Sequence, residues 1–149
     1  MGQDDNSNDT AASSKPLSRI MIVDDESDII FIMKRYFEVQ KFAVEAFTDP
    51  VKALGHFKQN SKDYSLVISD IRMPGISGIE LSQEIKKIAP KVKVILMSSF
   101  EIPPSEFSEV NNSNKIIDDF MQKPVGLKAL LNKVTKQLDH KGEDDRGGC

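Results

Sequence analysis

Five polar side chains come directly after short apolar runs of this chain. Asp24 and Asp25 follow the first run, Asp70 the third, Ser98 the fourth and Lys123 the fifth. Three carboxylates brought together repel one another, which raises their pKa values unless a cation compensates the charge. Mg²⁺ suits such a site, because it prefers oxygen ligands, keeps several waters and is often held by one or two carboxylates and a phosphate. We expect Mg²⁺ here, with Mn²⁺ as a possible substitute.

The lysine and the serine extend this chemistry to phosphate. Lys123 supplies a mobile point charge for a phosphate or carboxylate oxygen, and Ser98 supplies a hydroxyl donor. A metal and an ammonium that clamp a migrating group while a carboxylate attacks it describe a phosphoryl-transfer site. Asp70 is the candidate nucleophile, and Asp24 and Asp25 are the candidate ligands of the ion, directly or through water.

These side chains meet only if the apolar runs are parallel strands of one sheet. The pattern predicts strands over 19–23, 42–47, 66–69, 92–97 and 116–121. Helical spacing predicts helices that begin at Ser27, at Pro50 with Asp49 as N-cap, near the capping-box pair Ser77 and Glu80, and a last one with apolar positions 127–138. Only the segment 101–115 resists assignment. Alternating strands and helices indicate an α/β, doubly wound parallel sheet with helices on both faces and sites at the carboxyl ends of its strands.

Length and composition indicate a single domain and argue against nucleic-acid-binding and membrane-spanning proteins. Of the 149 residues, 39% are hydrophobic, enough for one core. We predict a disordered polar tail over 1–16, a domain over 17–139, and a flexible tail over 140–149 without an output domain. A net charge of −3 disfavours nucleic-acid binding. No apolar run is long enough to span a membrane, and the single cysteine, Cys149, fits a reducing, cytoplasmic compartment.

Four motifs in order give the chain a family resemblance. They are VDDES over 23–27, SDIRMPGISGIEL over 69–81, LMSS over 96–99 and QKPV over 122–125. Together they resemble the receiver domain of two-component response regulators, over about residues 17–139. The resemblance implies a flavodoxin-like sheet with strand order 2-1-3-4-5. It also implies that Asp70 accepts a phosphoryl group from a sensor histidine kinase or a phosphotransfer protein, and that Asp24, Asp25, Asp70 and the backbone carbonyl of Arg72 bind Mg²⁺.

The same resemblance implies how the signal leaves the site. Lys123 would contact the phosphate, and the Lys123–Pro124 peptide would be cis. Ser98 would move to the phosphate and Phe120 would follow it inward, in place of the threonine and tyrosine that are commoner there. The resemblance thus implies a stand-alone switch that catalyses its own phosphorylation and dephosphorylation and binds a downstream protein target, as a monomer or a phosphorylation-linked dimer, without direct contact with nucleic acid or membrane.

Other interpretations remain open for the same residues. Asp25 and Asp70 taken singly are typical of helix caps and turns. The alternation of strands and helices also fits a cofactor binder, but the acidic run Asp24 to Glu26 would repel the phosphate of FMN. A phosphatase of the haloacid-dehalogenase kind would need a second aspartate two residues after the nucleophile, where this chain has Arg72. A receiver that serves only as a docking platform fits less well, because the acidic set and Lys123 are complete.

Overall fold

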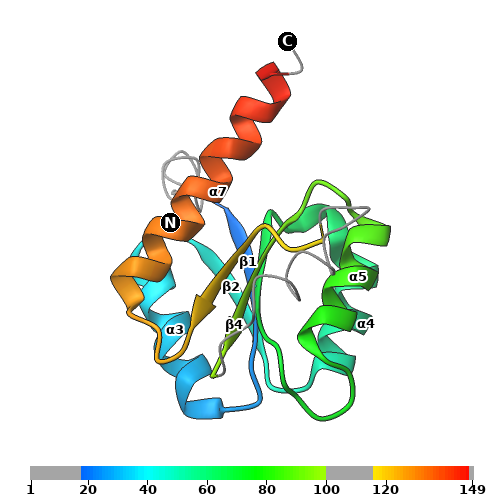
Figure 1. Ribbon diagram of the computed structural model, residues 1–149, viewed down its shortest axis with the longest axis vertical. Coiled ribbons are helices and arrows are strands. Elements are labelled where there is room, and N and C mark those ends of the chain that lie inside the picture. Colours follow the sequence, from blue (N-terminus) through cyan, green and yellow to red (C-terminus); the bar gives the residue numbers. More distant parts are fainter. Residues whose placement is uncertain (1–17, 100–115, 148–149) are drawn as a thin grey trace, which may run out of the picture.

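The computed structural model describes residues 18–99 and 116–147, which form one open sheet with helices on both faces (Figure 1). All strand pairs are parallel, and the order is β2-β1-β3-β4-β5, so the predicted fold class is confirmed. The predictions for 1–16, for 101–115 and for Cys149 lie outside the described residues. The elements are β1 (Arg19–Val23), α3 (Ser27–Val39), β2 (Ala43–Phe47), α4 (Pro50–Asn60), the 3-10 turn η1 (Ser61–Asp63), β3 (Leu66–Asp70), α5 (Gly78–Ile88), β4 (Lys93–Ser98), β5 (Asp119–Gln122) and α7 (Leu127–Gly147).

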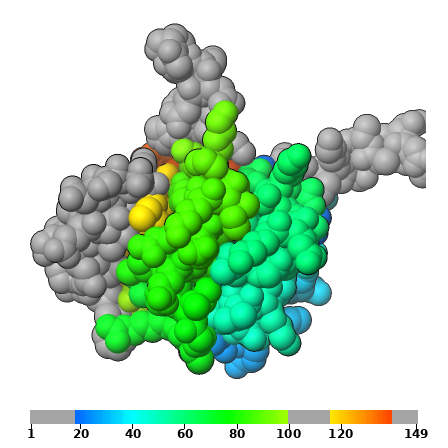
Figure 2. Space-filling view, turned by 90° about the vertical axis from the view of Figure 1, so that its right-hand side faces the viewer, coloured from blue at the N-terminus to red at the C-terminus, as the bar shows by residue number. Residues whose placement is uncertain are grey.

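Two apolar clusters hold the helices against the sheet. Alternate residues of a strand point to opposite faces, so Ile20 and Ile22 of β1 pack under α3 and α7, while Met21 and Val23 pack under α4 and α5. Figure 1 shows this division, and Figure 2 shows α4 and α5 side by side on their face. The central strands carry uninterrupted apolar runs, with polar residues only at their ends, because both faces are covered, as in other parallel sheets.

The predicted helix starts at α4 and α5 are confirmed in atomic detail. The Asp49 carboxylate accepts hydrogen bonds from the backbone N–H groups of Val51 and Lys52, with Pro50 at the first helical position. At α5, the Ser77 hydroxyl accepts from the Glu80 N–H, and the Glu80 carboxylate accepts from the Ser77 N–H. This reciprocal capping box fixes the start of the helix that comes after the turn following β3.

The fifth strand begins at Asp119, three residues after the predicted start at Ile116. The reason is that the Asp118 side chain takes the place of a backbone partner in the hydrogen-bond ladder with β4. The Val94 N–H donates to the Asp118 carboxylate at 2.8 Å rather than to a backbone carbonyl. That carboxylate is also paired with Lys86 at 2.9 Å, with only 2% of the Asp118 side chain exposed. Regular pairing with β4 therefore begins at Asp119.

The last helix is longer than the apolar stripe predicted, since α7 continues to Gly147 through residues expected to form a flexible tail. It extends past the end of the sheet in Figure 1. Once a helix is nucleated, each added residue contributes one more backbone hydrogen bond, so an existing helix continues through Gly142 at a cost of about 1 kcal/mol. No helix among the described residues is long and apolar enough to cross a membrane.

Gly78 brings the start of α5 against the end of β3. A Cβ at this position would overlap the backbone carbonyl of Asp70, and the Gly78 N–H donates to the Ile71 carbonyl at 2.7 Å.

We expect Gly78→Ala to lower the free energy of unfolding by about 2–3 kcal/mol in urea titrations, since backbone atoms must give way. Gly55→Ala is the matched control, because nothing lies within 4 Å of its added Cβ. In the middle of α4 it should stabilise by about 0.5–1 kcal/mol, and equal effects of the two changes would contradict the close approach.

Candidate functional site

The strand register brings the two central aspartates together. Val23 of β1 pairs with Ser69 of β3, so the residues next in the chain, Asp24 and Asp70, are neighbours at the carboxyl edge of the sheet. These two strands are central, which places the carboxylates between both helical layers. Asp24 is fully buried and Asp70 is 7% exposed, whereas Asp25 faces solvent. The site is therefore a recessed edge of the core with one open side.

The lysine and the serine reach the same edge from the other half of the sheet. Ser98 of β4 pairs with Gln122 of β5, and the Lys123 N–H donates to the Ser98 carbonyl at 2.7 Å. The Lys123–Pro124 peptide bond is cis, the conformation that the resemblance implied. Backbone pairing alone thus places Lys123 and Ser98 beside the aspartates.

The carboxylates of Asp24, Asp25 and Asp70 fit a divalent cation. One oxygen from each lies within 4.8 Å of the others. Oδ1 of Asp24 accepts the Glu26 N–H at 2.9 Å, and the buried Oδ2 faces the Lys123 ammonium at 2.9 Å. Three carboxylates gathered here carry more negative charge than one ammonium offsets, and a divalent cation would reduce their mutual repulsion. The all-oxygen donor set also matches what Mg²⁺ requires.

Lys123 places a positive charge beside these carboxylates. Its Nζ lies 2.9 Å from Asp24 Oδ2, 2.8 Å from Glu26 Oε1 and 3.6 Å from Asp70 Oδ2. Burial disfavours the charged ammonium, but the contacts with Glu26 and Asp24 and the charge of Asp70 outweigh it, so the pKa of Lys123 is raised. Lys123 therefore stays charged across the physiological range.

The pKa of Asp70 is raised as well, which for a carboxyl group favours the neutral form. Burial, and then the charge of Asp24, raise its pKa from 3.8 to about 6, although Lys123 acts in the other direction. At neutral pH Asp70 is therefore a carboxylate whose negative charge is disfavoured by burial and by the neighbouring Asp24. A carboxylate with incomplete solvation, facing a cation, has the properties of a nucleophile rather than of a structural ion pair.

A polar pocket of about 240 Å³ surrounds the exposed side of this group. It has room for a tetrahedral anion beside Asp70, with the Lys123 ammonium at its wall. Its lining includes Asp25, Asp70, Arg72, Ser98 and Lys123, which were predicted for the site, together with Glu26 and Ser99, which were not. The predicted Asp24 is fully buried.

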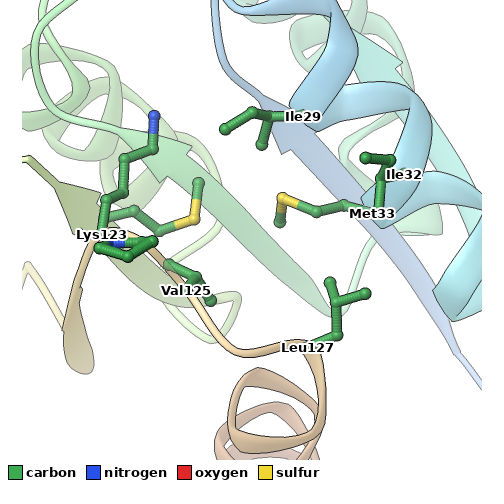
Figure 3. A pocket seen from close by; sticks show the side chains of 8 residues that line it. Ile29, Ile32, Met33, Lys123, Val125 and Leu127 are labelled. Atoms are coloured by element: carbon green, nitrogen blue, oxygen red, sulfur yellow. The ribbon is translucent and has the colours of Figure 1, made fainter.

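A second pocket, of about 250 Å³, adjoins the first and is almost wholly apolar (Figure 3). Lys123 lines both pockets, and its ammonium points away from Val125 and Leu127 in Figure 3. The α3 side of this pocket is formed by Ile29, Ile32 and Met33. An acidic pocket thus borders an apolar one at the start of α3.

One predicted residue is set apart from the polar pocket, and one contact was missed by sequence reasoning. Phe120 is half-buried against the apolar cluster under α4 and α5, opposite Leu96. Its movement toward Ser98 stays a prediction.

The missed contact is the one between Glu26 and Lys123. The available signal was a glutamate where a helix N-cap was expected, a position that favours Ser, Thr, Asp or Asn.

The raised pKa of Asp70 predicts a gain in stability when its charge is removed. The folded pKa of about 6 lies above the unfolded value of 3.8, so the folded protein binds this proton more tightly. The stability contributed by the proton is present below pH 4 and is lost as pH rises through 6. At pH 7.5 without divalent cations, we expect Asp70→Asn to raise the free energy of unfolding by about 1–2 kcal/mol, after allowance for partial solvation. Urea titrations at pH 7.5 and pH 4 check this, because the advantage should vanish at the lower pH. An advantage that is the same at both would contradict the raised pKa.

Known proteins share this fold and match this sequence over most of its length. Residues 20–135 match the response regulator receiver domain family. Response regulator RppA of Synechocystis is 28% identical over 116 residues, which are 78% of this chain and 48% of RppA. The chain spans about half the length of the curated relatives that it matches over most of its own length.

Two solved structures extend the comparison. A CheY-like receiver domain protein from Methanospirillum hungatei JF-1 has a TM-score of 0.76 at 26% identity, covering 86% of this chain and 98% of that one. Response regulator TrrA from Thermotoga maritima, in complex with Mg²⁺-BeF, has a TM-score of 0.69 at 32% identity, covering 81% of this chain and 99% of TrrA. Since the family match runs from β1 into α7, the chain belongs to the response regulator receiver domain family and is a phosphoacceptor switch rather than a classical enzyme.

Proposed function

We propose that Asp70 is the phosphoacceptor, that the donor is a phosphohistidine of a sensor histidine kinase or phosphotransfer protein, and that the reaction needs Mg²⁺. The observation that carries the proposal is the environment of Asp70. Its carboxylate is recessed at a polar pocket, shares a 4.8 Å cluster with Asp24 and Asp25, and lies 3.6 Å from Lys123.

The transfer is consistent with this geometry. An Asp70 oxygen attacks phosphorus, a new O–P bond forms, and the N–P bond to the donor histidine breaks, with the electron pair leaving on the imidazole nitrogen. The Lys123 ammonium offsets charge on the phosphoryl oxygens. Asp24, Asp25 and the Arg72 carbonyl would hold Mg²⁺, which supplies further charge neutralisation when bound. Asp25 lines the pocket and faces solvent, so water would reach the acyl phosphate and the switch would reset by hydrolysis.

The surface around the pocket supports a protein as the phosphate donor. Ile32 of α3 is 54% exposed and lines the apolar pocket with the partly exposed Ile29, Val125 and Leu127. Exposed apolar side chains grouped at a site are typical of a surface that binds another protein. A helical donor with an apolar face would cover them and bring its histidine to Asp70. Such a donor would meet this domain in the cytoplasm.

The output is proposed to be a change in protein binding. Ser98 would move to the phosphate and Phe120 would turn inward, which shifts an existing equilibrium between two conformations. A net charge of −3 supports a protein target rather than nucleic acid. We propose that the domain works either as a monomer or as a phosphorylation-linked dimer.

Intact mass spectrometry tests the Mg²⁺ requirement. The full chain is incubated with a small acyl-phosphate donor at pH 7.5, with Mg²⁺ or with a chelator. We expect one phosphoryl adduct that forms readily with Mg²⁺ and at least about a hundredfold more slowly without it, since cation clamping contributes several kcal/mol to such transfers. An adduct that forms equally fast in the chelator would refute the metal requirement.

A further inference from the structure

Glu26 uses its carboxylate in an unusual way for its position. It is the N-cap residue of α3, yet its side chain makes no capping hydrogen bond. The carboxylate instead accepts a hydrogen bond from Lys123 Nζ at 2.8 Å, across 97 residues of sequence. The Glu26 side chain is 59% exposed, whereas that of Lys123 is 8% exposed. An exposed acidic group thus holds a nearly buried cation from the solvent side.

The distances from Lys123 Nζ to three carboxylates show that the ammonium lies nearer to Asp24 and Glu26 than to Asp70. Nζ is within 3 Å of Asp24 and Glu26 but 3.6 Å from Asp70. A phosphoryl group on Asp70 would lie in the polar pocket, which Glu26 also lines. Lys123 has three N–H donors, and Asp24 and Glu26 occupy two of them. The ammonium can therefore give one hydrogen bond to the phosphoryl oxygens as it stands, and a second one only if it shares or gives up Glu26 or Asp24.

We propose that Glu26 is a positioning residue that holds Lys123 back from Asp70 in the unphosphorylated protein and so weakens the phosphorylated state. The proposal rests on the proposed function of Asp70 as phosphoacceptor. The contact stabilises only the state in which Lys123 is held by Glu26, so its loss shifts the equilibrium toward the state in which Lys123 binds phosphate. The residue thereby limits how long the phosphoryl group persists.

Glu26→Gln tests the proposal with little change of shape. Beryllofluoride with Mg²⁺, the group bound to TrrA, serves as the phosphoryl mimic, and calorimetry gives its Kd for the full chain. We expect Glu26→Gln to bind about two- to fivefold more tightly than the wild type, the range for one partly exposed ion pair. Asp28→Asn is the matched control, because it removes a nearby exposed carboxylate of the same helix. Its Kd should stay at the wild-type value.

A double-mutant cycle separates positioning from simple charge repulsion. If Glu26 acts through Lys123, Glu26→Gln should have no effect on Kd in a Lys123→Gln background. If the twofold or larger gain persists there, Glu26 repels the anion directly and the proposal is overturned.

A second measurement needs neither phosphate nor metal. In protein labelled with ¹⁵N-lysine, the Lys123 ammonium signal should exchange faster with water in Glu26→Gln than in the wild type, and an unchanged rate would also overturn the proposal. If wild-type protein binds no beryllofluoride, the proposed function fails and this inference fails with it. If wild type binds and Glu26→Gln matches its Kd, only this inference fails.

Discussion

Asp70→Asn is expected to abolish phosphorylation by a small acyl-phosphate donor in the presence of Mg²⁺. The amide keeps the size of the side chain and its place at the end of β3 but lacks the nucleophilic oxygen charge. Removing the nucleophile from an active site lowers rates by several powers of ten, so the adduct should form at least about a thousandfold more slowly. The measurement is the time course of the intact mass of the variant beside the wild type.

Two controls make that result specific. Asp63→Asn changes an exposed aspartate of η1 outside the pocket and should be phosphorylated like the wild type. Urea unfolding of Asp70→Asn should show a folded protein that is at least as stable as the wild type at pH 7.5, because the amide removes a charge that burial disfavours. A full-rate adduct in Asp70→Asn would show that another residue accepts the phosphate.

Lys123→Met is expected to have the largest effect on stability. The ammonium is the close partner of the fully buried Asp24, and the methionine side chain preserves the apolar stem that lines the second pocket. Breaking a buried pair by removing one partner leaves an uncompensated charge, so the free energy of unfolding should fall by about 3 kcal/mol without divalent cations. Urea titration measures this. Mg²⁺ at millimolar concentration should restore part of the loss, because it replaces the missing positive charge.

The comparison variant for this experiment is Lys87→Met. Lys87 also pairs with a carboxylate, Glu84 at 3.2 Å, but its side chain is 72% exposed. Exposed pairs contribute little, so its effect should stay within about 0.5 kcal/mol. Similar losses in the two variants, or no response of Lys123→Met to Mg²⁺, would contradict the electrostatic account of the pocket.

Most of the fold could be read from local patterns. The strands coincide with apolar runs because both faces of a parallel sheet are covered, which leaves a contiguous signal in the sequence. Asp49 and Ser77 were recognisable as caps because their partners are two or three residues away. The start of β5 was not recognisable, since it depends on a contact between Asp118 and Val94 across the sheet.

The site could be predicted as a set of residues but not as a geometry. The carboxyl ends of parallel strands meet at one edge of the sheet, so Asp24, Asp70 and Lys123 were expected to lie together there. Which carboxylate the ammonium prefers depends on side-chain conformations at close range. The contact of Lys123 with Glu26, and the fit of Gly78 against Asp70, therefore emerged only from the structure.

Chemical mapping of the phosphorylated protein identifies the side chain that accepts the phosphoryl group. Borohydride reduces an acyl phosphate to a primary alcohol but leaves free carboxylates and phosphate esters intact. After phosphorylation with Mg²⁺ and reduction, peptide mass spectrometry of the wild-type chain should locate a single reduced side chain, at position 70. A reduced residue at Asp24 or Asp25, or an adduct that resists reduction, would contradict the assignment of Asp70 as the phosphoacceptor.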